Sequence, residues 1–356
     1  MPEGVALEAW RRIALDPPRA RGTVRATGTI RVDAADFVVE ERLGFEPDGG
    51  SAHFLVRVEK RNANTLHVAR GLAAGLGRAP QDIGFAGMKD RRAIARQWFT
   101  VPAAKGPEPT VGLAGDGFEV IAVLPHSRKL RRGALAGNRF CIRVRELAGD
   151  IAALTARIDS VSSAGYPNYF GAQRFGIEGA NLGRVQHWLL EGGLPRGREP
   201  RAFVFSCARA LAFNAVLGLR VADGSWDRLL PGEVVNLAGS ASVFVADQPD
   251  EALQERCRSG DVAPTGPLCG DGGKQPVDEA GRIEATALAP LAPLPERLAA
   301  AGLRAERRAL VVRPAGMRQR LTKDALELDF ELPRGAFATS LLREILEVSA
   351  PDVGAE

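Results

Sequence analysis

The sequence predicts an α+β fold in more than one domain, and three observations lead to this prediction. The chain has 356 residues, whereas a compact domain typically holds about 150 residues, so two or three domains are expected. Strand-like alternation of apolar residues fills the N-terminal part and returns near the C-terminus, and helical spacing dominates between them. Hydrophobic residues make up 45% of the chain and charged residues 25%, as in an ordinary globular protein.

The N-terminal part reads as two strands followed by a helix. The strands are predicted at 37–43 and 54–60, and apolar residues recur at every second position of the latter. Asn64 is a suitable N-cap for the helix, and Gly77 is a suitable stop. The predicted apolar stripe of this helix contains Leu66, Ala69, Leu72, Ala73 and Leu76.

The remaining elements are predicted from the same periodicities. A short strand at 82–86 runs into a turn at Gly87, and a loop rich in Pro and Gly covers 102–117. Further strands are expected at 118–124, 139–145, 309–313 and 325–332, and helices at 151–162, 182–190, 207–219 and 340–347. Between 222 and 304 long periodic segments are few, which predicts a separate or inserted unit.

The distribution of charge is more informative than its sum. The net charge is only +4, from 47 basic and 43 acidic residues. Between 120 and 145 no acidic residue occurs, while the basic residues there are Arg128, Lys129, Arg131, Arg132, Arg139, Arg143 and Arg145. A block of one sign suits a surface that binds a polyanion, because neutralised phosphates release counterions. The alternative is a solvated strand face.

No metal-binding or disulfide pattern is visible in the sequence. The cysteines at 141, 207, 257 and 269 form no C-x-x-C pair, and the four histidines form no H-x-x-x-H pattern. We therefore expect neither a metal nor a cofactor. The N-terminus does not resemble a secretory signal, and no apolar run approaches the roughly 20 residues that span a bilayer. These features predict a cytoplasmic protein that does not associate with membranes, and no protein partner is indicated.

The segment Gly84–Trp98, G-F-A-G-M-K-D-R-R-A-I-A-R-Q-W, contains the strongest candidate for a catalytic group. It places the carboxylate of Asp90 among four cations, Lys89, Arg91, Arg92 and Arg96. An aspartate in such surroundings stays ionised at neutral pH, which suits a nucleophile or a charge-stabilising group better than a proton donor. The same cations would attract phosphate. A solvated loop is the alternative, because turns favour the same residues.

Several segments resemble the TruD family of tRNA pseudouridine synthases. In the N-terminal half they are Ile30–Phe45 with its Asp36–Glu40 core, Glu59–Lys60, Asn64–Thr65, Gly87–Ala93 and Gln97–Trp98. Later segments follow in the family's order: Gly137–Phe140, Pro167–Gly176, Gly266–Gly270 and Leu332–Thr339. The blocks G-x-K-D and N-Y-F-G-x-Q-R-F-G are the most specific. The resemblance extends over most of the chain.

The resemblance implies an architecture. A pseudouridine-synthase catalytic domain with a mixed, largely antiparallel sheet is expected from 1–166 and 306–356. An inserted α+β domain specific to TruD is expected at 167–305. A cleft between the two would accept an RNA stem, and the basic block is the candidate for one of its walls.

The resemblance also implies a reaction, the isomerisation of a uridine in tRNA to pseudouridine, with position 13 as the expected site. Asp90 matches the family's essential aspartate. An ionised carboxylate serves this reaction by attacking the sugar or the base, or by stabilising a glycal route, so no cofactor is required. The target uridine must first leave the base stack, which costs a few kcal/mol.

Further residues match family positions near the substrate. Phe140 matches an aromatic ring that packs on the uracil, and Asn138 matches a residue that orients the aspartate by hydrogen bonding. Without the resemblance, Phe140 would read as core and Asn138 as a turn residue. Lys89 matches the basic neighbour of the nucleophile, and Arg31 stands where a lysine is expected, so both are candidates for contacting the substrate.

Other residues are candidates for contacting the RNA backbone, namely Arg91, Arg92, Arg128, Lys129, Arg131, Arg132 and Arg174. The block around Arg174, from Tyr169 to Phe175, reads either as a stacking platform for bases or as a packed junction, and the junction is favoured. Phe337 replaces a tyrosine of the family's G-x-Y-A-T pattern, which removes one hydroxyl.

Two other classes of function fit parts of the sequence. An RNA-binding protein or chaperone acting on tRNA without catalysis would account for the basic block. A hydrolase acting on a nucleoside or glycoside would account for Asp90, but the motif contains no second carboxylate to act as the acid.

Overall fold

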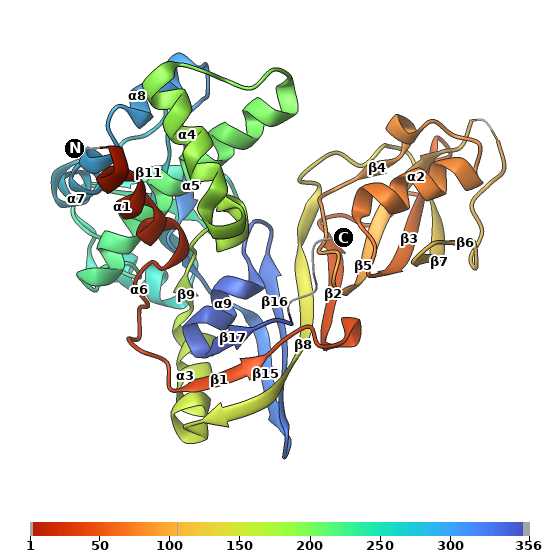
Figure 1. The fold of residues 1–356 in the computed structure, drawn as a ribbon, viewed down its shortest axis with the longest axis horizontal. Coiled ribbons are helices and arrows are strands. Elements are labelled where there is room, and N and C mark those ends of the chain that lie inside the picture. Colours follow the sequence, from red (N-terminus) through yellow and green to blue (C-terminus); the bar gives the residue numbers. More distant parts are fainter. Residues whose placement is uncertain (1–2, 105, 352–356) are drawn as a thin grey trace. The chain divides into compact units, whose positions relative to one another are not determined.

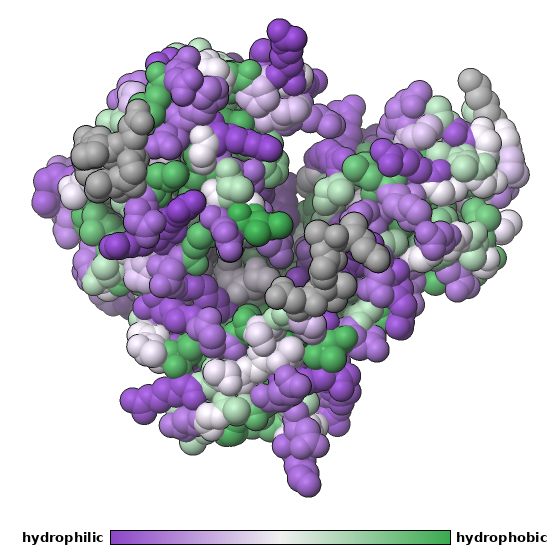
Figure 2. Space-filling model, in the orientation of Figure 1, coloured by the Kyte–Doolittle hydropathy of each residue, from purple (hydrophilic) through white to green (hydrophobic). Residues whose placement is uncertain are grey.

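The computed structural model of the chain describes residues 3–104 and 106–351 (Figure 1). The described residues divide into two compact units. Unit 1 contains the chain up to Val24, then Asp159–Arg313 and Phe337–Ile345. Unit 2 contains the described residues of 25–158, 314–336 and 346–351. On the face shown in Figure 2, hydrophilic residues cover most of each unit, and hydrophobic residues form small scattered patches.

Unit 2 is built on an eleven-stranded sheet with the central order β15-β16-β8-β2-β5-β3-β7-β6, to which β1, β4 and β17 are added. Its strands are β1 (Ala26–Thr29), β2 (Phe37–Leu43), β3 (His53–Arg61), β4 (Gly84–Phe85), β5 (Ile94–Pro102), β6 (Ala114–Gly115), β7 (Phe118–His126), β8 (Leu135–Gly149), β15 (Ala315–Leu321), β16 (Ala325–Pro333) and β17 (Glu347–Ser349). The pairs β2–β5 and β1–β17 are parallel, and the other pairs are antiparallel. The prediction of a mixed, largely antiparallel sheet is therefore confirmed.

One helix of unit 2, α2 (Thr65–Gly75), packs on the sheet and closes a core that includes Val56, Val58 and Phe99 (Figure 1). Asn64 occupies the predicted N-cap with extended backbone angles, but its side chain makes no capping hydrogen bond. Leu66 was expected in the buried stripe and is instead 44% exposed. Its place is taken by Thr65 and Val68, which are fully buried, because the helix begins one residue after Asn64 and turns that face to the sheet.

Unit 1 combines helices with a four-stranded sheet of order β11-β10-β12-β13. Its strands are β9 (Tyr166–Pro167), β10 (Glu233–Leu237), β11 (Val243–Ala246), β12 (Val262–Leu268), β13 (Glu306–Ala309) and β14 (Val311–Val312). Its helices are α1 (Glu3–Leu15), α4 (Ala180–Glu191), α5 (Arg198–Ala222), α6 (Glu251–Ser259), α7 (Asp278–Leu288), α8 (Leu294–Ala300) and α9 (Ala338–Ile345), and α3 (Ile151–Ala164) continues the chain from unit 2 into unit 1. The α+β prediction thus describes both units.

The segments that belong to unit 1 differ from those expected for the inserted domain. Residues up to Val24 and 337–345 were expected in the catalytic domain, and they pack in unit 1 instead. Burial of apolar side chains explains this: Trp10 of α1 lies in the same core as Leu182 and Leu211. Ser340 of α9 donates a hydrogen bond to the carbonyl of Tyr169, at 3.0 Å. Chain segments far apart in sequence therefore complete one core.

The helix α5 is the longest in the described part of the chain, and it begins well before the predicted 207–219. By length and composition alone it is apolar enough to cross a membrane, which the sequence interpretation did not anticipate. Within unit 1, however, 61% of its apolar window is buried. It packs against α1, α4, α7 and β12, so it is the central helix of a protein core.

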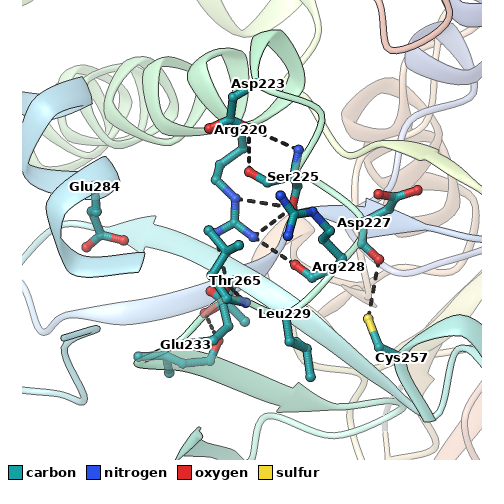
Figure 3. Close-up of polar contacts among 12 residues, drawn as sticks. Arg220, Asp223, Ser225, Asp227, Arg228, Leu229, Glu233, Cys257, Thr265 and Glu284 are labelled. Carbon is teal, nitrogen blue, oxygen red and sulfur yellow. Dashed lines mark hydrogen bonds and ion pairs between the residues drawn. The ribbon is translucent and has the colours of Figure 1, made fainter. Parts of the chain in front are cut away.

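A buried ion pair lies where α5 meets the sheet of unit 1 (Figure 3). Arg220 of α5 donates to Glu233 of β10 at 2.9 Å, and both side chains are at most 2% exposed. The same guanidinium donates to the carbonyls of Ser225 and Arg228. Burial raises the pKa of Glu233, while the charge of Arg220 opposes that shift. The arginine thus connects the end of α5 to the following loop and to β10.

Candidate active site

Asp90 lies in a turn that follows the strand β4, as the sequence predicted, and this turn leads into β5, which the sequence did not predict. Three fully buried polar side chains hold the backbone of this turn. Gln97 donates to the carbonyl of Gly87 at 2.7 Å, and the amide of Lys89 donates to Oγ1 of Thr65 at 2.9 Å. Thr65 in turn donates to Oε1 of Gln97 at 3.0 Å. Because buried backbone groups require such partners, these bonds fix the path of the turn.

Lys60, the third of these side chains, binds the backbone of Asp90 itself. Its Nζ donates to the carbonyl of Asp90 at 2.6 Å and to that of Ala63 at 2.7 Å. Burial lowers the pKa of Lys60 to about 8, and the charge of Asp90 opposes this shift. Lys60 continues the buried positions Val56 and Val58 of β3, so a strand position that normally carries an apolar residue here supports the turn.

The carboxylate of Asp90 forms an ion pair with Arg31. Nη2 of Arg31 donates to Oδ2 of Asp90 at 2.8 Å, and the two side chains are 13% and 39% exposed. The guanidinium also lies 4.2 Å from the centre of the Phe37 ring, as in a cation–π contact. The aspartate is therefore partly open to solvent, with a fixed cation on one side.

The backbone of Arg31 has a φ of 60°, in the left-handed region that costs a non-glycine residue roughly 1 kcal/mol or more. Residues next to it are held in place: the amide of Ile30 donates to the carbonyl of Ser349 of β17 at 2.9 Å. The position of Arg31 thus depends on pairing between segments from opposite ends of the chain.

Lys89 points away from Asp90 and joins two strands of the sheet. Its Nζ lies 2.7 Å from Oε2 of Glu41 on β2 and 2.7 Å from Oδ1 of Asn138 on β8. Glu41 and Asn138 are directly opposite each other in the antiparallel pairing of these strands. The hydrogen bond expected between Asn138 and the aspartate is not found among the described residues, and Asn138 accepts from Lys89 instead.

The Glu41–Lys89 pair is buried, with side chains 0% and 6% exposed. Burial raises the pKa of Glu41, and the charge and hydrogen bond of Lys89 oppose that shift. A second hydrogen bond to Glu41 comes from the amide of Trp98, at 3.3 Å. This carboxylate is therefore held by one ion pair and one backbone hydrogen bond.

Phe140 is 6% exposed and packs in an aromatic cluster. It lies on the same face of the sheet as Asn138, two residues earlier on β8. Its ring is stacked 5.5 Å from that of Phe330 and meets Phe37 edge-on at 6.1 Å. Phe37 in turn contacts Arg31, so the cluster connects Phe140 to the ion pair of Asp90. These surroundings are those of a core residue, one of the two interpretations open for Phe140.

The cations that neighbour Asp90 in sequence contact other groups. Arg96 pairs with Glu59, its partner across β5 and β3, at 2.9 Å. Arg92 donates to the carbonyl of Pro351 at 2.9 Å, and Arg91 is exposed. The residue that pairs with the carboxylate, Arg31, lies far away in sequence. Sequence proximity therefore misidentified the source of positive charge, because Arg96 lies in β5 directly opposite Glu59 of β3 and pairs with it.

The basic block separates into two parts. On β8, Arg139 pairs with Asp329, Arg143 with Glu327, and Arg145 with Asp36. The residues of the loop between β7 and β8 are exposed and, within the described part of the chain, have no carboxylate in ion-pair range; they are Arg128, Lys129, Arg131 and Arg132. Within the basic block, only the cations of this loop have no carboxylate partner among the described residues and so remain available to bind an anion. We call it the basic loop below.

The basic loop packs against the strand that leads to Asp90. The guanidinium of Arg132 lies 3.8 Å from the centre of the Phe85 ring. The amide of Gly133 donates to the carbonyl of Ala86 at 2.7 Å, and that of Leu130 donates to Thr100 at 3.0 Å. The cations are thus attached to the same local structure as the turn.

Arg174 belongs to unit 1, whereas the residues described above belong to unit 2. It donates to Oγ of Ser206 at 3.0 Å and contacts the ring of Phe170. The neighbouring side chains Tyr169 and Phe175 are buried. The side chains of this block are packed within unit 1. Phe337 packs against the ring of Phe170 in the same unit.

The sequence did not single out Glu41 as a site residue or assign a role to Lys60, Thr65 or Gln97. A signal was present for Lys60, a charged residue in a series of buried positions. The contacts of Glu41 depend on which strand pairs with which, and this is not readable from a single strand.

The arrangement provides a carboxylate on a fixed backbone, a cation beside it and a basic loop nearby. A fixed carboxylate can attack an electrophilic carbon or stabilise a cationic sugar. The loop can bind phosphates.

Comparison with known proteins agrees with this chemistry. The sequence profile described as tRNA pseudouridine synthase D (TruD) matches residues 20–196 and 201–345. A tRNA pseudouridine synthase D of Nitrosococcus oceani is 43% identical over 336 residues, which cover 93% of this chain and 92% of that protein. One of Xanthomonas euvesicatoria is 40% identical over 349 residues, covering 93% and 95%.

A solved structure has the same fold. The crystal structure of a protein described as a tRNA pseudouridine synthase D from Methanosarcina mazei matches with a TM-score of 0.70 at 21% identity. The match covers 94% of this chain and 97% of that one. Since both the profile and relatives of at least 40% identity span most of the sequence, the chain belongs to the TruD family of tRNA pseudouridine synthases.

Proposed function

We propose that this protein isomerises a uridine in tRNA to pseudouridine and that Asp90 is the catalytic residue. The observation that carries the proposal is the placement of its carboxylate. It is 39% exposed, so a substrate can reach it, and it is held by Arg31 at 2.8 Å. Its backbone carbonyl is fixed by the buried Lys60. Fixed groups of this kind stabilise transition-state charge without the cost of reorganisation.

The reaction requires no oxidant, reductant or leaving group outside the substrate. The bond between N1 of uracil and C1′ of ribose breaks, the base turns, and a bond between C5 and C1′ forms. The hydrogen on C5 is lost as a proton, and N1 gains one, so atoms and electrons balance. A carboxylate at Asp90 serves attack on the sugar, attack on the base and the glycal route equally. No cofactor is needed for any of them.

The substrate is proposed to bind across unit 2. The target uridine, which the family resemblance assigns to position 13, leaves its stack and packs against Phe140, at a cost of a few kcal/mol for unstacking. Lys89 and Asn138, joined by their 2.7 Å hydrogen bond, line the site beside it. We assign Arg31 to holding Asp90, and the exposed Arg91 and the basic loop to contacting phosphates. Arg92 and Arg174 remain candidates for the RNA backbone.

We further propose that unit 2 is the catalytic domain, because Asp90 and the side chains that hold it all belong to it. Unit 1 then corresponds to the family-specific domain, completed by the chain up to Val24 and by 337–345. The relatives are tRNA-modifying enzymes by name, and we assign the protein to the cytoplasm, where such a reaction would meet its substrate.

The test is to incubate the purified protein, without added cofactor, with a tRNA transcript that contains only ordinary uridine and to map pseudouridine. We expect product from the wild type and none from Asp90→Asn, while the affinity for tRNA changes little. Asp90→Asn is nearly isosteric and removes the charge. If the wild type binds tRNA but forms no product, the protein is an RNA-binding protein and the proposal fails. Release of free uracil would identify a hydrolase instead.

A further inference from the structure

A cavity of about 620 Å³ lies beside the basic loop, and the proposed reaction does not account for it. Its lining includes three rings, Phe45, His53 and His126, and three cations, Arg128, Lys129 and Arg131. The volume is within the range of about 300–1,000 Å³ that is typical of small-ligand sites. The cavity lies entirely within unit 2.

The rings come from the end of the sheet. His53 and His126 are directly opposite each other where β3 pairs with β7, so their side chains are on the same face. The His126 ring is stacked on Phe45, with centres 5.2 Å apart and planes 15° from parallel. Nδ1 of His53 is buried and makes no hydrogen bond within the described part of the chain. These side chains offer aromatic surface and an unused polar atom.

The start of the basic loop is held rigidly at the mouth of the cavity. Asp48 accepts hydrogen bonds from the amides of Gly50 and Ser127, at 3.0 and 2.8 Å, and from the hydroxyl of Ser127. Its other neighbour is His126, with Nδ1 3.1 Å from Oδ1. Asp48 is therefore engaged in positioning the loop and does not pair with Arg128, Lys129 or Arg131.

The basic loop also connects the cavity to the turn of Asp90. Its far end contacts Phe85 and Ala86 through Arg132 and Gly133. Phe85 pairs with Phe99 of β5 and His53 pairs with Pro102, three residues further on, which corresponds to about 10 Å along a strand. An RNA strand that follows the loop from the turn would therefore reach the cavity.

We propose that this cavity binds a second nucleotide of the substrate RNA, distinct from the target uridine, with its base against His53 and its phosphates on Arg128 and Arg131. The inference rests on the proposed function, since it requires that the protein binds RNA. Aromatic surface beside a row of cations is the usual basis of binding to unpaired nucleotides. Such a subsite would help to choose the substrate without taking part in the chemistry.

The test uses full-length protein carrying Asp90→Asn, so that bound RNA is not converted, and a fluorescein-labelled tRNA transcript. The dissociation constant is measured by fluorescence anisotropy over a series of salt concentrations. The variants are Arg128→Ala/Arg131→Ala and His53→Leu. The matched control is Arg70→Ala, which removes an exposed arginine of α2 outside the cavity. Thermal unfolding of each variant reports folding, and His53→Gln is a second variant in case His53→Leu does not fold.

We expect the double variant to bind more weakly and to lower the slope of log Kd against log salt by about 0.7–0.9 for each phosphate that is no longer neutralised. The His53 variants should weaken binding by roughly 5- to 100-fold, the range for removing the ring on which one base stacks, and leave the slope unchanged. Arg70→Ala should change neither. A loop variant with the slope of the control, or His53 variants with wild-type affinity, would overturn the proposal.

A competition experiment separates an RNA subsite from a site for free nucleotides. An excess of UMP should leave the labelled tRNA bound. If UMP displaces tRNA from the parent protein by occupying this cavity, and no longer does so in the His53 variants, the cavity is a free-nucleotide site and the assignment to RNA is wrong. Formation of pseudouridine by protein with the native Asp90 is measured separately, so failure of the proposed function is distinguishable from failure of this inference.

Discussion

At the scale of single residues, the ion pair between Arg31 and Asp90 combines three unusual features of one side chain. Arg31 keeps a left-handed backbone conformation, contacts Phe37 and donates to the carboxylate. A residue of this kind has a positioning role, since it acts through the aspartate.

The variant Arg31→Ala tests this role. A hydrogen bond to a charged partner contributes about 1.5–3 kcal/mol, so we expect kcat for pseudouridine formation to fall by roughly 10- to 100-fold. Single-turnover kinetics on a tRNA transcript, with RNA affinity measured in parallel, provide the numbers. Arg31→Lys keeps the charge and should recover part of the rate. An equal loss in both variants would argue that the guanidinium, and not the charge, is required.

The buried Glu41–Lys89 pair gives a prediction about pH. Because burial raises the pKa of Glu41 in the folded state, the folded protein holds that proton at a pH where the unfolded chain has released it. The resulting stability is present below the ordinary pKa of glutamate, about 4.3, and is lost as pH rises through the raised value. Glutamine does not titrate.

Glu41→Gln leaves the buried Lys89 without its ion pair and should be less stable than the wild type, but this loss should shrink as pH rises from the ordinary pKa of glutamate, about 4.3, through the raised pKa of Glu41. Urea denaturation at several pH values measures the difference in the free energy of unfolding. A difference that does not vary with pH would contradict the assignment of the raised pKa to Glu41.

At the scale of elements, the turn that carries Asp90 depends on close packing between β4, β5 and the basic loop. A Cβ atom at Gly84 would lie 2.3 Å from Oγ1 of Thr100 and 2.8 Å from the carbonyl oxygen of Leu130. At Gly87, three residues later, it would meet nothing within 4 Å, and the backbone there is not left-handed. Gly84 and Gly87 therefore provide a tightly packed position and an open position for comparing the same substitution.

Gly84→Ala should lower the free energy of unfolding by about 1–3 kcal/mol, the usual cost of overpacking, and should reduce activity because it displaces the turn. Gly87→Ala should be tolerated in both respects. Chemical denaturation and the pseudouridine assay on the same preparations check both. If the two variants behave alike, packing at β4 does not control the turn.

At the scale of the whole molecule, each unit has its own hydrophobic core and its own sheet. Unit 1 also contains the buried pair of Arg220 and Glu233. Removal of one partner from such a pair leaves an uncompensated buried charge, which costs about 3–5 kcal/mol.

Glu233→Ala should accordingly destabilise unit 1 and leave the core of unit 2 protected. Hydrogen exchange followed by mass spectrometry should show faster exchange in α5, β10 and β12, with little change in β2, β8 and β16. Glu255→Ala is the control, since it removes a carboxylate from an exposed pair with Arg258 and should cost at most about 1 kcal/mol. Equal acceleration in both units would mean that they unfold as one.

The sequence by itself determined the strands with clear alternation and the helices with clear periodicity. The predicted strand 37–43 coincides with β2, and the helix predicted at 151–162 coincides with most of α3. The strand β5 was missed, because the polar residues Gln97 and Thr100 occupy fully buried positions, so apolar and polar residue types do not alternate along it. The sequence also singled out Asp90 as a candidate, and the resemblance of several segments indicated the family, which the comparisons confirm.

Only the tertiary structure decided what surrounds that aspartate. Arg31 reaches Asp90 because β1 pairs with β17 and β8, and Glu41 reaches Lys89 because β2 lies between β8 and β5. The division of the basic block has the same origin, since β16 supplies the carboxylates that pair with Arg139 and Arg143. Periodicity encodes which face of an element is buried, but the partner across a sheet is set by strand pairing between distant segments.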